Sequence, residues 1–171
     1  MICLRGALLM YLTVRPKCPT KVGHDWAKAW EKIPASKADI QEAVYCYALD
    51  RNTACVFHLM RVAEMGLRKI SGKLKVKLLH SGKNIYPIEF ADWGTVIEEC
   101  KKKIENARKA LPPGKRQKVM ELYADISDHC LFMKEIWRNN ISHARNTYTE
   151  QEALAVMGRV RDFMTLMADC L

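Results

Sequence analysis

The tract Arg138-Asn139-Asn140-Ile141-Ser142-His143 contains the side chains of this chain that are best suited to chemistry on a phosphate. An arginine is permanently charged and presents a planar fork of donors that matches phosphate oxygens. A histidine titrates near neutral pH, so it can accept or donate a proton. The amide of Asn139 can hydrogen bond to the imidazole of His143 or to a phosphate oxygen. These residue types at this spacing indicate cleavage of RNA.

RNA cleavage without a metal ion needs a base, a cation and an acid. The base deprotonates the ribose 2′-hydroxyl, the cation stabilises the charge on the phosphorane, and the acid protonates the leaving 5′-oxygen. We predict His143 as the base or the acid, and Arg138 as the group that clamps and neutralises the phosphate. One tract supplies one histidine, so a two-fold dimer that joins two tracts would supply both proton-transfer groups. A homodimer is therefore part of the predicted chemistry, and neither a metal ion nor a cofactor is.

The same residues also have a plain structural interpretation. Arg138 follows a predicted helix and could satisfy its last carbonyls, and Asn139 and Asn140 are ordinary helix-terminating residues. A second functional hypothesis therefore stays open, in which the chain is a non-catalytic helical module that binds a nucleotide, a nucleic acid or a protein partner through the same surface. The chain contains no Walker loop, GxGxxG, HExxH, GxSxG or paired CxxC motif, so the common nucleotidase, dehydrogenase, protease and hydrolase classes lack their local signatures.

A second group of polar residues lies on one side of a predicted helix and comprises His58, Arg61 and Glu64. Their side chains could hold the phosphate-binding residues in place by hydrogen bonds. The alternative, which we favour, is an ion pair between Arg61 and Glu64 within the helix.

A third group is basic and surrounds a predicted helix-loop-helix. Its candidate RNA-binding members are Lys101, Lys102, Arg108, Lys115 and Arg116. Such a group could follow a phosphate backbone, or it could be a solvated basic face. The other histidines, His24, His80 and His129, have no partners at metal-ligand spacing, and Asp125 and Asp128 with His129 are expected on a solvated helix face.

Composition sets the outer bounds of these predictions. The 171 residues, 49% of them apolar, suit one compact domain, and the net charge of +9 favours encounters with polyanions. Seven scattered cysteines without a CxxC pair predict a reduced, cytoplasmic protein. The apolar stretch 2–14 is too short for a membrane span of about 20 residues and lacks a clear signal-peptide cleavage site, so no membrane association is expected.

The elements that position these groups are predicted to be helices. After a turn-rich lead-in segment over residues 1–35, Ser36 is predicted to cap a helix that ends near Arg51, and a second helix is expected from Thr53 to Ser71, ended by Gly72. Residues 73–91 are expected to form a loop with short strands. Asp92 is predicted to cap a helix over 93–110 that ends at Pro112-Pro113-Gly114. A long helix then starts near Lys115, and Thr149 to Glu152 form a capping box for the last helix. These elements predict an all-α antiparallel bundle, with the main domain over 36–171.

The tract Ile136-Trp137-Arg138-Asn139-Asn140-Ile141-Ser142-His143, followed by Tyr148-Thr149-Glu150 and an amphipathic helix, resembles the signature of the HEPN superfamily. That signature is an arginine, a polar residue that is commonly Asn, Asp or His, and a histidine after four to six intervening positions. The segment 53–64 also resembles the second helix of bacterial proteins of this kind, and the resemblance covers residues 36–171.

The resemblance implies a helical bundle that dimerises at the motif. In many members it also implies metal-independent endoribonuclease activity of toxin–antitoxin, defence or RNA-processing systems, with an antitoxin protein as a partner, whereas other members bind nucleotides or proteins. In toxins paired with a nucleotidyltransferase antitoxin, a tyrosine two positions after the histidine is modified. Arg145 stands at that position here, so this form of regulation does not carry over.

Overall fold

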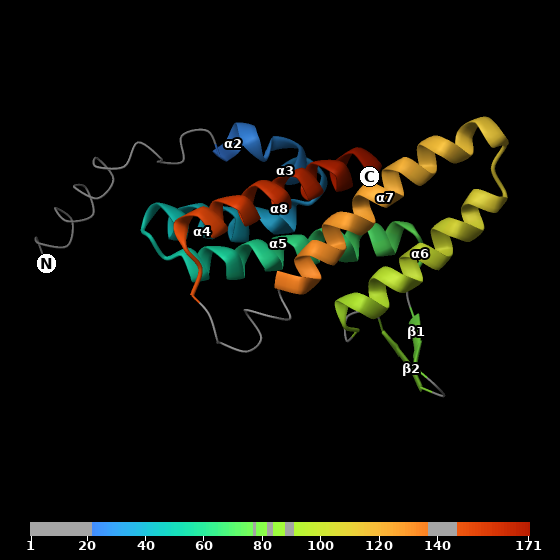
Figure 1. The fold of residues 1–171 in the computed structure, drawn as a ribbon, viewed down its shortest axis with the longest axis horizontal. Helices are drawn as coiled ribbons and strands as arrows, with labels where there is room; N and C mark the ends of the chain where they lie inside the picture. Colours follow the sequence, from blue (N-terminus) through green and yellow to red (C-terminus); the bar gives the residue numbers. More distant parts are fainter. Residues whose placement is uncertain (1–21, 77, 82–83, 88–90, 137–146) are drawn as a thin grey trace, which may run out of the picture.

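The computed structural model describes residues 22–76, 78–81, 84–87, 91–136 and 147–171 (Figure 1). Its elements in chain order are α2 (Val22–Asp25), α3 (Ala27–Lys32), the 3-10 helix η1 (Pro34–Ser36), α4 (Lys37–Ala48), α5 (Asn52–Lys73), β1 (Leu78–Ser81), β2 (Asn84–Pro87), α6 (Trp93–Lys109), α7 (Pro113–Ile136) and α8 (Glu150–Cys170). The predicted all-α fold is confirmed. Within the described ranges the strands form a single antiparallel hairpin, in which Leu78 pairs with Pro87 and Ser81 with Asn84. Short strands were expected in this segment.

Helices α4 and α5 form the predicted antiparallel hairpin. The chain reverses at Asp50, which has a φ of 57°, and α5 then returns along α4. The apolar stripe of α4 packs against that of α5, and the buried residues of the two stripes are Ile40, Ala43, Val44, Tyr47, Val56, Leu59, Met60, Ala63, Leu67 and Ile70. The hairpin therefore follows from the spacing of apolar residues along the sequence.

The ends of this hairpin differ from the prediction. Ser36 precedes α4, but its hydroxyl donates to the Ile33 carbonyl at 2.8 Å and makes no capping hydrogen bond. Helix α5 begins at Asn52 and passes through Gly72 to Lys73, so the glycine does not terminate it. The left-handed residue after the helix is Lys75, with a φ of 59°.

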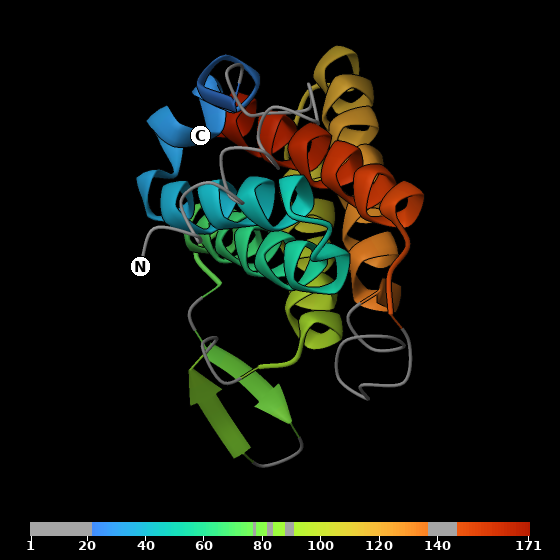
Figure 2. The same cartoon turned by 90° about the vertical axis from the view of Figure 1, so that its left-hand side faces the viewer.

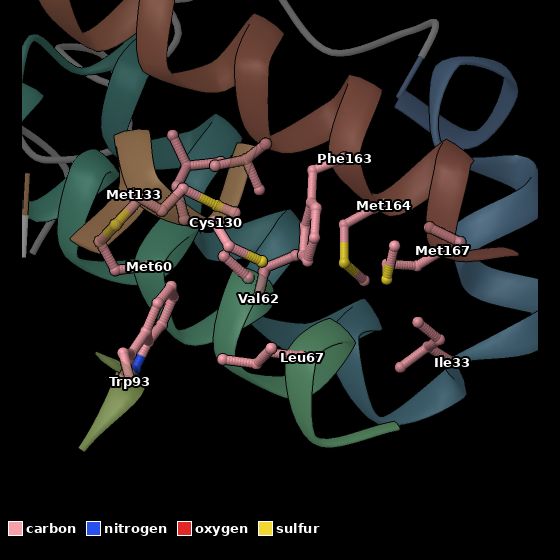
Figure 3. Packing of buried hydrophobic residues seen from close by; sticks show 14 of the residues in the cluster. Ile33, Met60, Val62, Leu67, Trp93, Cys130, Met133, Phe163, Met164 and Met167 are labelled. Atoms are coloured by element: carbon pink, nitrogen blue, oxygen red, sulfur yellow. The ribbon is translucent and has the colours of Figure 1, made fainter. Parts of the chain in front are cut away.

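Helix α8 lies against the α4–α5 hairpin and completes the core (Figure 2). Its start has the predicted capping box, because Thr149 Oγ1 accepts from the Glu152 backbone N–H and the Glu152 carboxylate accepts from the Thr149 backbone N–H. Met164 and Phe163 of α8 approach α5 at Gly66, where an added Cβ would lie 2.7 Å from Met164 Sδ and 3.0 Å from Phe163 Cε1. Figure 3 shows these side chains in the core with Met60 and Val62 of α5. The absence of a side chain at Gly66 therefore permits the close approach of the two helices.

The segment before α4 also packs on α8. Trp26, Ala29 and Ile33 are buried in the same core cluster, and the Lys28 ammonium pairs with the Asp169 carboxylate at 2.8 Å. The part of the predicted lead-in segment that contains Trp26 is therefore packed in the bundle.

Helices α6 and α7 form a second antiparallel pair whose joined ends project beyond the other helices (Figure 1). Asp92 caps α6 as predicted, since its carboxylate accepts from the Thr95 N–H at 3.1 Å and the Thr95 hydroxyl at 2.5 Å. Helix α7 starts at Pro113, two residues earlier than predicted, because a proline suits the first position of a helix. On α7 the predicted residues Ile126, Cys130 and Met133 are buried, whereas Met120 on the projecting part is exposed.

Candidate functional site

The predicted catalytic residues Arg138, Asn139 and His143 lie outside the described residues, so the structure does not test their geometry. It does describe the two helices that flank the tract. Helix α7 ends at Ile136, which packs against the core, and α8 starts after Thr149. The backbone N–H of Tyr148 donates to Thr53 Oγ1 at 3.1 Å. The chain after the tract is therefore attached to the first turn of α5.

The α7 and α8 segments next to the tract carry exposed apolar side chains. Leu131 and Phe132 lie in the last turns of α7, and Leu154 lies in the first turns of α8. The guanidinium of Arg159 stacks over the Phe132 ring at 5.2 Å, which connects the two helices at this surface. Leu131 and Phe132 are adjacent on α7, and neighbouring exposed apolar side chains are typical of a protein interface.

Asp39 of α4 and His58 and Arg61 of α5 form a polar cluster that joins the two helices. Among the described residues, this cluster has the side chains best suited to catalysis. The Oδ1 atom of Asp39 lies 2.8 Å from His58 Nδ1 and accepts a hydrogen bond from Arg61 Nε, also at 2.8 Å. The Asp39 side chain is only 10% exposed, whereas that of His58 is 26% and that of Arg61 is 49% exposed. The carboxylate is thus buried behind two more accessible donors.

This cluster corrects the expected ion pair between Arg61 and Glu64. Arg61 pairs with Asp39 across the two helices, and Glu64 instead accepts hydrogen bonds from Arg68 Nε at 3.0 Å and Nη2 at 2.5 Å. An interhelical partner prevails because Asp39 is buried at the α4–α5 contact, where an unpaired carboxylate would be costly. Glu64 is therefore paired within its own helix with Arg68, which follows it by four residues, and not with Arg61.

Asp39 was not among the predicted residues, although the sequence contains a signal for it. It precedes Ala43 by four positions and therefore lies on the buried stripe of α4, where a carboxylate requires a partner. The partners come from another helix, so spacing within one helix could not identify them.

The electrostatics of the cluster keep Asp39 charged. Burial raises the pKa of the Asp39 carboxyl, but the hydrogen bonds from Arg61 and His58 and their positive charges outweigh it, so the pKa is lowered overall. The hydrogen bond to Asp39 in turn raises the pKa of Arg61. A carboxylate can only accept, so His58 donates from Nδ1 and directs its Nε2 to the opposite side of the ring. A carboxylate-oriented imidazole of this kind can bind an anion or transfer a proton.

The predicted basic face is largely paired with its own carboxylates. On α6, Lys101 lies 3.6 Å from Glu98, Lys102 lies 2.6 Å from Glu99, and Arg108 contacts Glu105 at 2.5 Å. Arg116 donates from Nε to the Leu111 carbonyl at 2.6 Å and so closes the turn between α6 and α7. Lys115 is exposed. Exposed pairs of this kind are weak and can be exchanged for a phosphate, but the solvated-face interpretation accounts for four of the five residues.

His129 differs from the predicted solvated position. Its ring packs against Phe163 of α8 with centroids 6.2 Å apart, and its Nδ1 is buried without a hydrogen-bond partner among the described residues. The neighbouring Asp125 and Asp128 are exposed, as expected. The histidine is therefore a packing residue of the α7–α8 contact.

An apolar cavity between α5, α6 and α7 contains two thiols. It is lined by Leu67, Ile70, Leu74, Ile97, Cys100, Lys101, Ile104, Ile126 and Cys130. Burial raises the pKa of Cys130 to about 12 and also raises that of Cys100, so both thiols are neutral at physiological pH. The space has room for about one water molecule and offers it few polar partners, so we assign it no ligand. The described parts of the chain contain no group of three metal-ligating side chains that could hold an ion.

Comparison with known proteins found no family model, no curated protein and no solved structure that matches this chain. Among the helices that the structure describes, none combines the length and the apolar character needed to cross a membrane.

Proposed function

We propose that this chain is a cytoplasmic, homodimeric, metal-independent endoribonuclease. The observation that carries the proposal is the set Arg138, Asn139 and His143, placed between two packed helices of an all-α bundle. The resemblance of this set to the HEPN signature supports the same activity. Under this proposal the partners are RNA and, in a toxin–antitoxin or defence system, an antitoxin protein.

Each residue has a defined role in the proposed reaction. His143 of one subunit removes the proton of the ribose 2′-hydroxyl, and His143 of the other subunit protonates the leaving 5′-oxygen. Arg138 stabilises the charge on the phosphorane, and Asn139 orients His143 or a phosphate oxygen. The exposed residues Leu131, Phe132 and Leu154 next to the tract support a dimer at this end of the molecule, since a second copy would cover them.

The test is cleavage of single-stranded RNA by the purified protein in the presence of a chelator. We expect products with a 2′,3′-cyclic phosphate and no cleavage of DNA, because the attacking group is the ribose hydroxyl. His143→Ala should reduce the rate by about 10²- to 10⁴-fold, and Arg138→Ala should reduce it comparably, while the helical content and the dimer are retained. His129→Ala, which changes a histidine that packs in the bundle, serves as the control for nonspecific loss of activity. Undiminished cleavage by the His143 variant would disprove the site assignment.

The second candidate function is a non-catalytic module that binds a nucleotide, a nucleic acid or a protein partner. The ion pairs of Lys102 and Arg108 with carboxylates of α6 favour a nucleotide or a protein as its ligand, because they leave less free positive charge for a long RNA backbone. If the protein cleaves no member of a broad RNA panel and yet binds a nucleotide or a protein partner, this second function replaces the first.

A further inference from the structure

The outer surface of α5 carries an aromatic ring, an imidazole and a guanidinium side by side. Phe57 and Arg61 are four positions apart, and His58 and Arg61 are three positions apart, so the three are neighbours on one helical surface. The Phe57 ring meets the His58 ring edge to face, with centroids 5.8 Å apart and planes at 83°. Phe57 is 41% exposed, so part of its ring is open to solvent.

Asp39 holds the two nitrogen-bearing side chains together from the buried side. His58 Nδ1 and Arg61 Nε are each 2.8 Å from the same carboxylate oxygen, so these two atoms lie within twice that distance of each other. The carboxylate fixes the planes of both groups and offsets the repulsion between them. His58 Nε2 and the two terminal nitrogens of Arg61 have no hydrogen-bond partner among the described residues.

The neighbouring carboxylate of α5 leaves this surface open to an anion. Glu64 accepts two hydrogen bonds from Arg68, the next arginine along the helix, so its charge is offset locally. Asp39 itself is buried and already accepts from two donors. Arg61 and His58 are thus more exposed than the Asp39 carboxylate, and the Glu64 carboxylate, whose charge also acts on Arg61, is engaged by Arg68.

We propose that Phe57, His58 and Arg61, backed by Asp39, bind a nucleoside monophosphate unit, either free or within an RNA strand. The phosphate accepts hydrogen bonds from the terminal nitrogens of Arg61, since the planar fork of an arginine matches two phosphate oxygens, and from His58 Nε2 when both ring nitrogens carry a proton. The base stacks on the exposed Phe57 ring, because every base has a π face that an aromatic side chain can cover. The hydrogen bonds to Asp39 use Nδ1 of His58 and Nε of Arg61, so the other nitrogens of both side chains remain for a ligand beside the exposed ring.

The proposal rests on residues of α4 and α5 alone and does not depend on RNA cleavage. It is tested with the full chain by isothermal titration with adenosine 5′-monophosphate, adenosine and inorganic phosphate. We expect the monophosphate to bind more tightly than either fragment, because only it engages both the ring and the two donors. Titration with a five-residue oligoadenylate distinguishes a free nucleotide from a unit of a strand, since a strand ligand should bind more tightly than the monophosphate.

The variants separate recognition from folding. Arg61→Gln should raise the Kd for the monophosphate by roughly ten- to hundredfold, the range expected for a lost hydrogen bond to a charged group. Phe57→Leu keeps an apolar side chain at an exposed position, and it should weaken binding of the monophosphate but not of inorganic phosphate. The matched control is Arg161→Gln, which removes an arginine of α8 that pairs with Asp162, and it should leave the Kd unchanged.

Three results would overturn the proposal. One is no binding of the monophosphate at millimolar concentration by the wild-type protein. Another is equal affinity of the wild type and the folded Phe57→Leu variant for the monophosphate. The third is a loss of affinity in Arg161→Gln as large as that in Arg61→Gln.

Discussion

Asp39 shows how one buried carboxylate determines the local chemistry of this molecule. It lies on the apolar stripe of α4, and Arg61 and His58 of α5 supply the hydrogen bonds that it requires. Because the folded state lowers its pKa, folding favours the charged form of this carboxyl. Its contribution to stability is therefore present above the pKa of the unfolded chain, about 3.9, and is lost as the pH falls through the lower pKa of the folded protein.

Asp39→Asn should lower the free energy of unfolding at pH 7 by about 1–3 kcal/mol, because the amide replaces a charged acceptor with a neutral one. The difference between wild type and variant should shrink as the pH falls below about 4, where the wild-type carboxyl becomes protonated. Urea unfolding followed by circular dichroism at pH 7 and at acid pH measures both quantities. Asp125→Asn, at an exposed position of α7, is the control and should change the stability little. A stability difference for Asp39→Asn that stays constant with pH would contradict the role of its charge.

At the scale of elements, the crossing of α5 and α8 depends on a missing side chain. Gly66 lies where Phe163 and Met164 of α8 come nearest to α5, and both of these residues are fully buried. A glycine in the middle of a helix costs about 1 kcal/mol relative to alanine. The close packing that it permits offsets this cost.

Gly66→Ala should therefore destabilise the protein through overpacking, which costs about 1–3 kcal/mol. The higher helix propensity of alanine offsets part of this cost. The matched control is Gly72→Ala in the same helix, where an added Cβ meets no atom within 4 Å. That substitution should be neutral or stabilising by up to about 1 kcal/mol. Denaturant unfolding of both variants measures the contrast, and equal stability changes would refute the packing role of Gly66.

At the scale of the whole molecule, we expect a second copy to bind at the turns of α7 and α8 that flank the Arg138 to His143 tract in the sequence. Exposed Leu131 and Phe132 lie in the last turns of α7 before the tract, exposed Leu154 lies in the first turns of α8 after it, and the proposed chemistry needs two histidines. The wild-type protein should be a dimer in light scattering at micromolar concentration.

Leu154→Glu should shift this dimer towards monomer without loss of helical content, because a carboxylate would have to be desolvated in the interface. Met120→Glu is the control, since Met120 is also exposed but lies near the start of α7, whereas the tract follows the end of that helix. A monomeric wild type, or equal dissociation in the two variants, would contradict the proposed interface.

Much of the bundle could be predicted from the sequence because the signals are local. Apolar spacing gave the α4–α5 hairpin and the stripe of α8, and the Thr149 capping box and the Asp92 cap were read directly from their residues. One helix end was predicted incorrectly. Gly72 was expected to end α5, but the helix continues to Lys73, and the left-handed residue that follows it is Lys75.

The sequence by itself determined the all-α class, the order of the helices and the residue types of the Arg138 to His143 tract, because periodicity and capping act over a few residues. Only the tertiary structure decided that Arg61 pairs with Asp39, that Glu64 pairs with Arg68, and that His129 packs against Phe163. The interhelical contacts join residues that are distant in the chain, and even the choice of Arg68 for Glu64 depends on Asp39 having taken Arg61. Burial determines which charges must find a partner, and burial is a property of the folded chain.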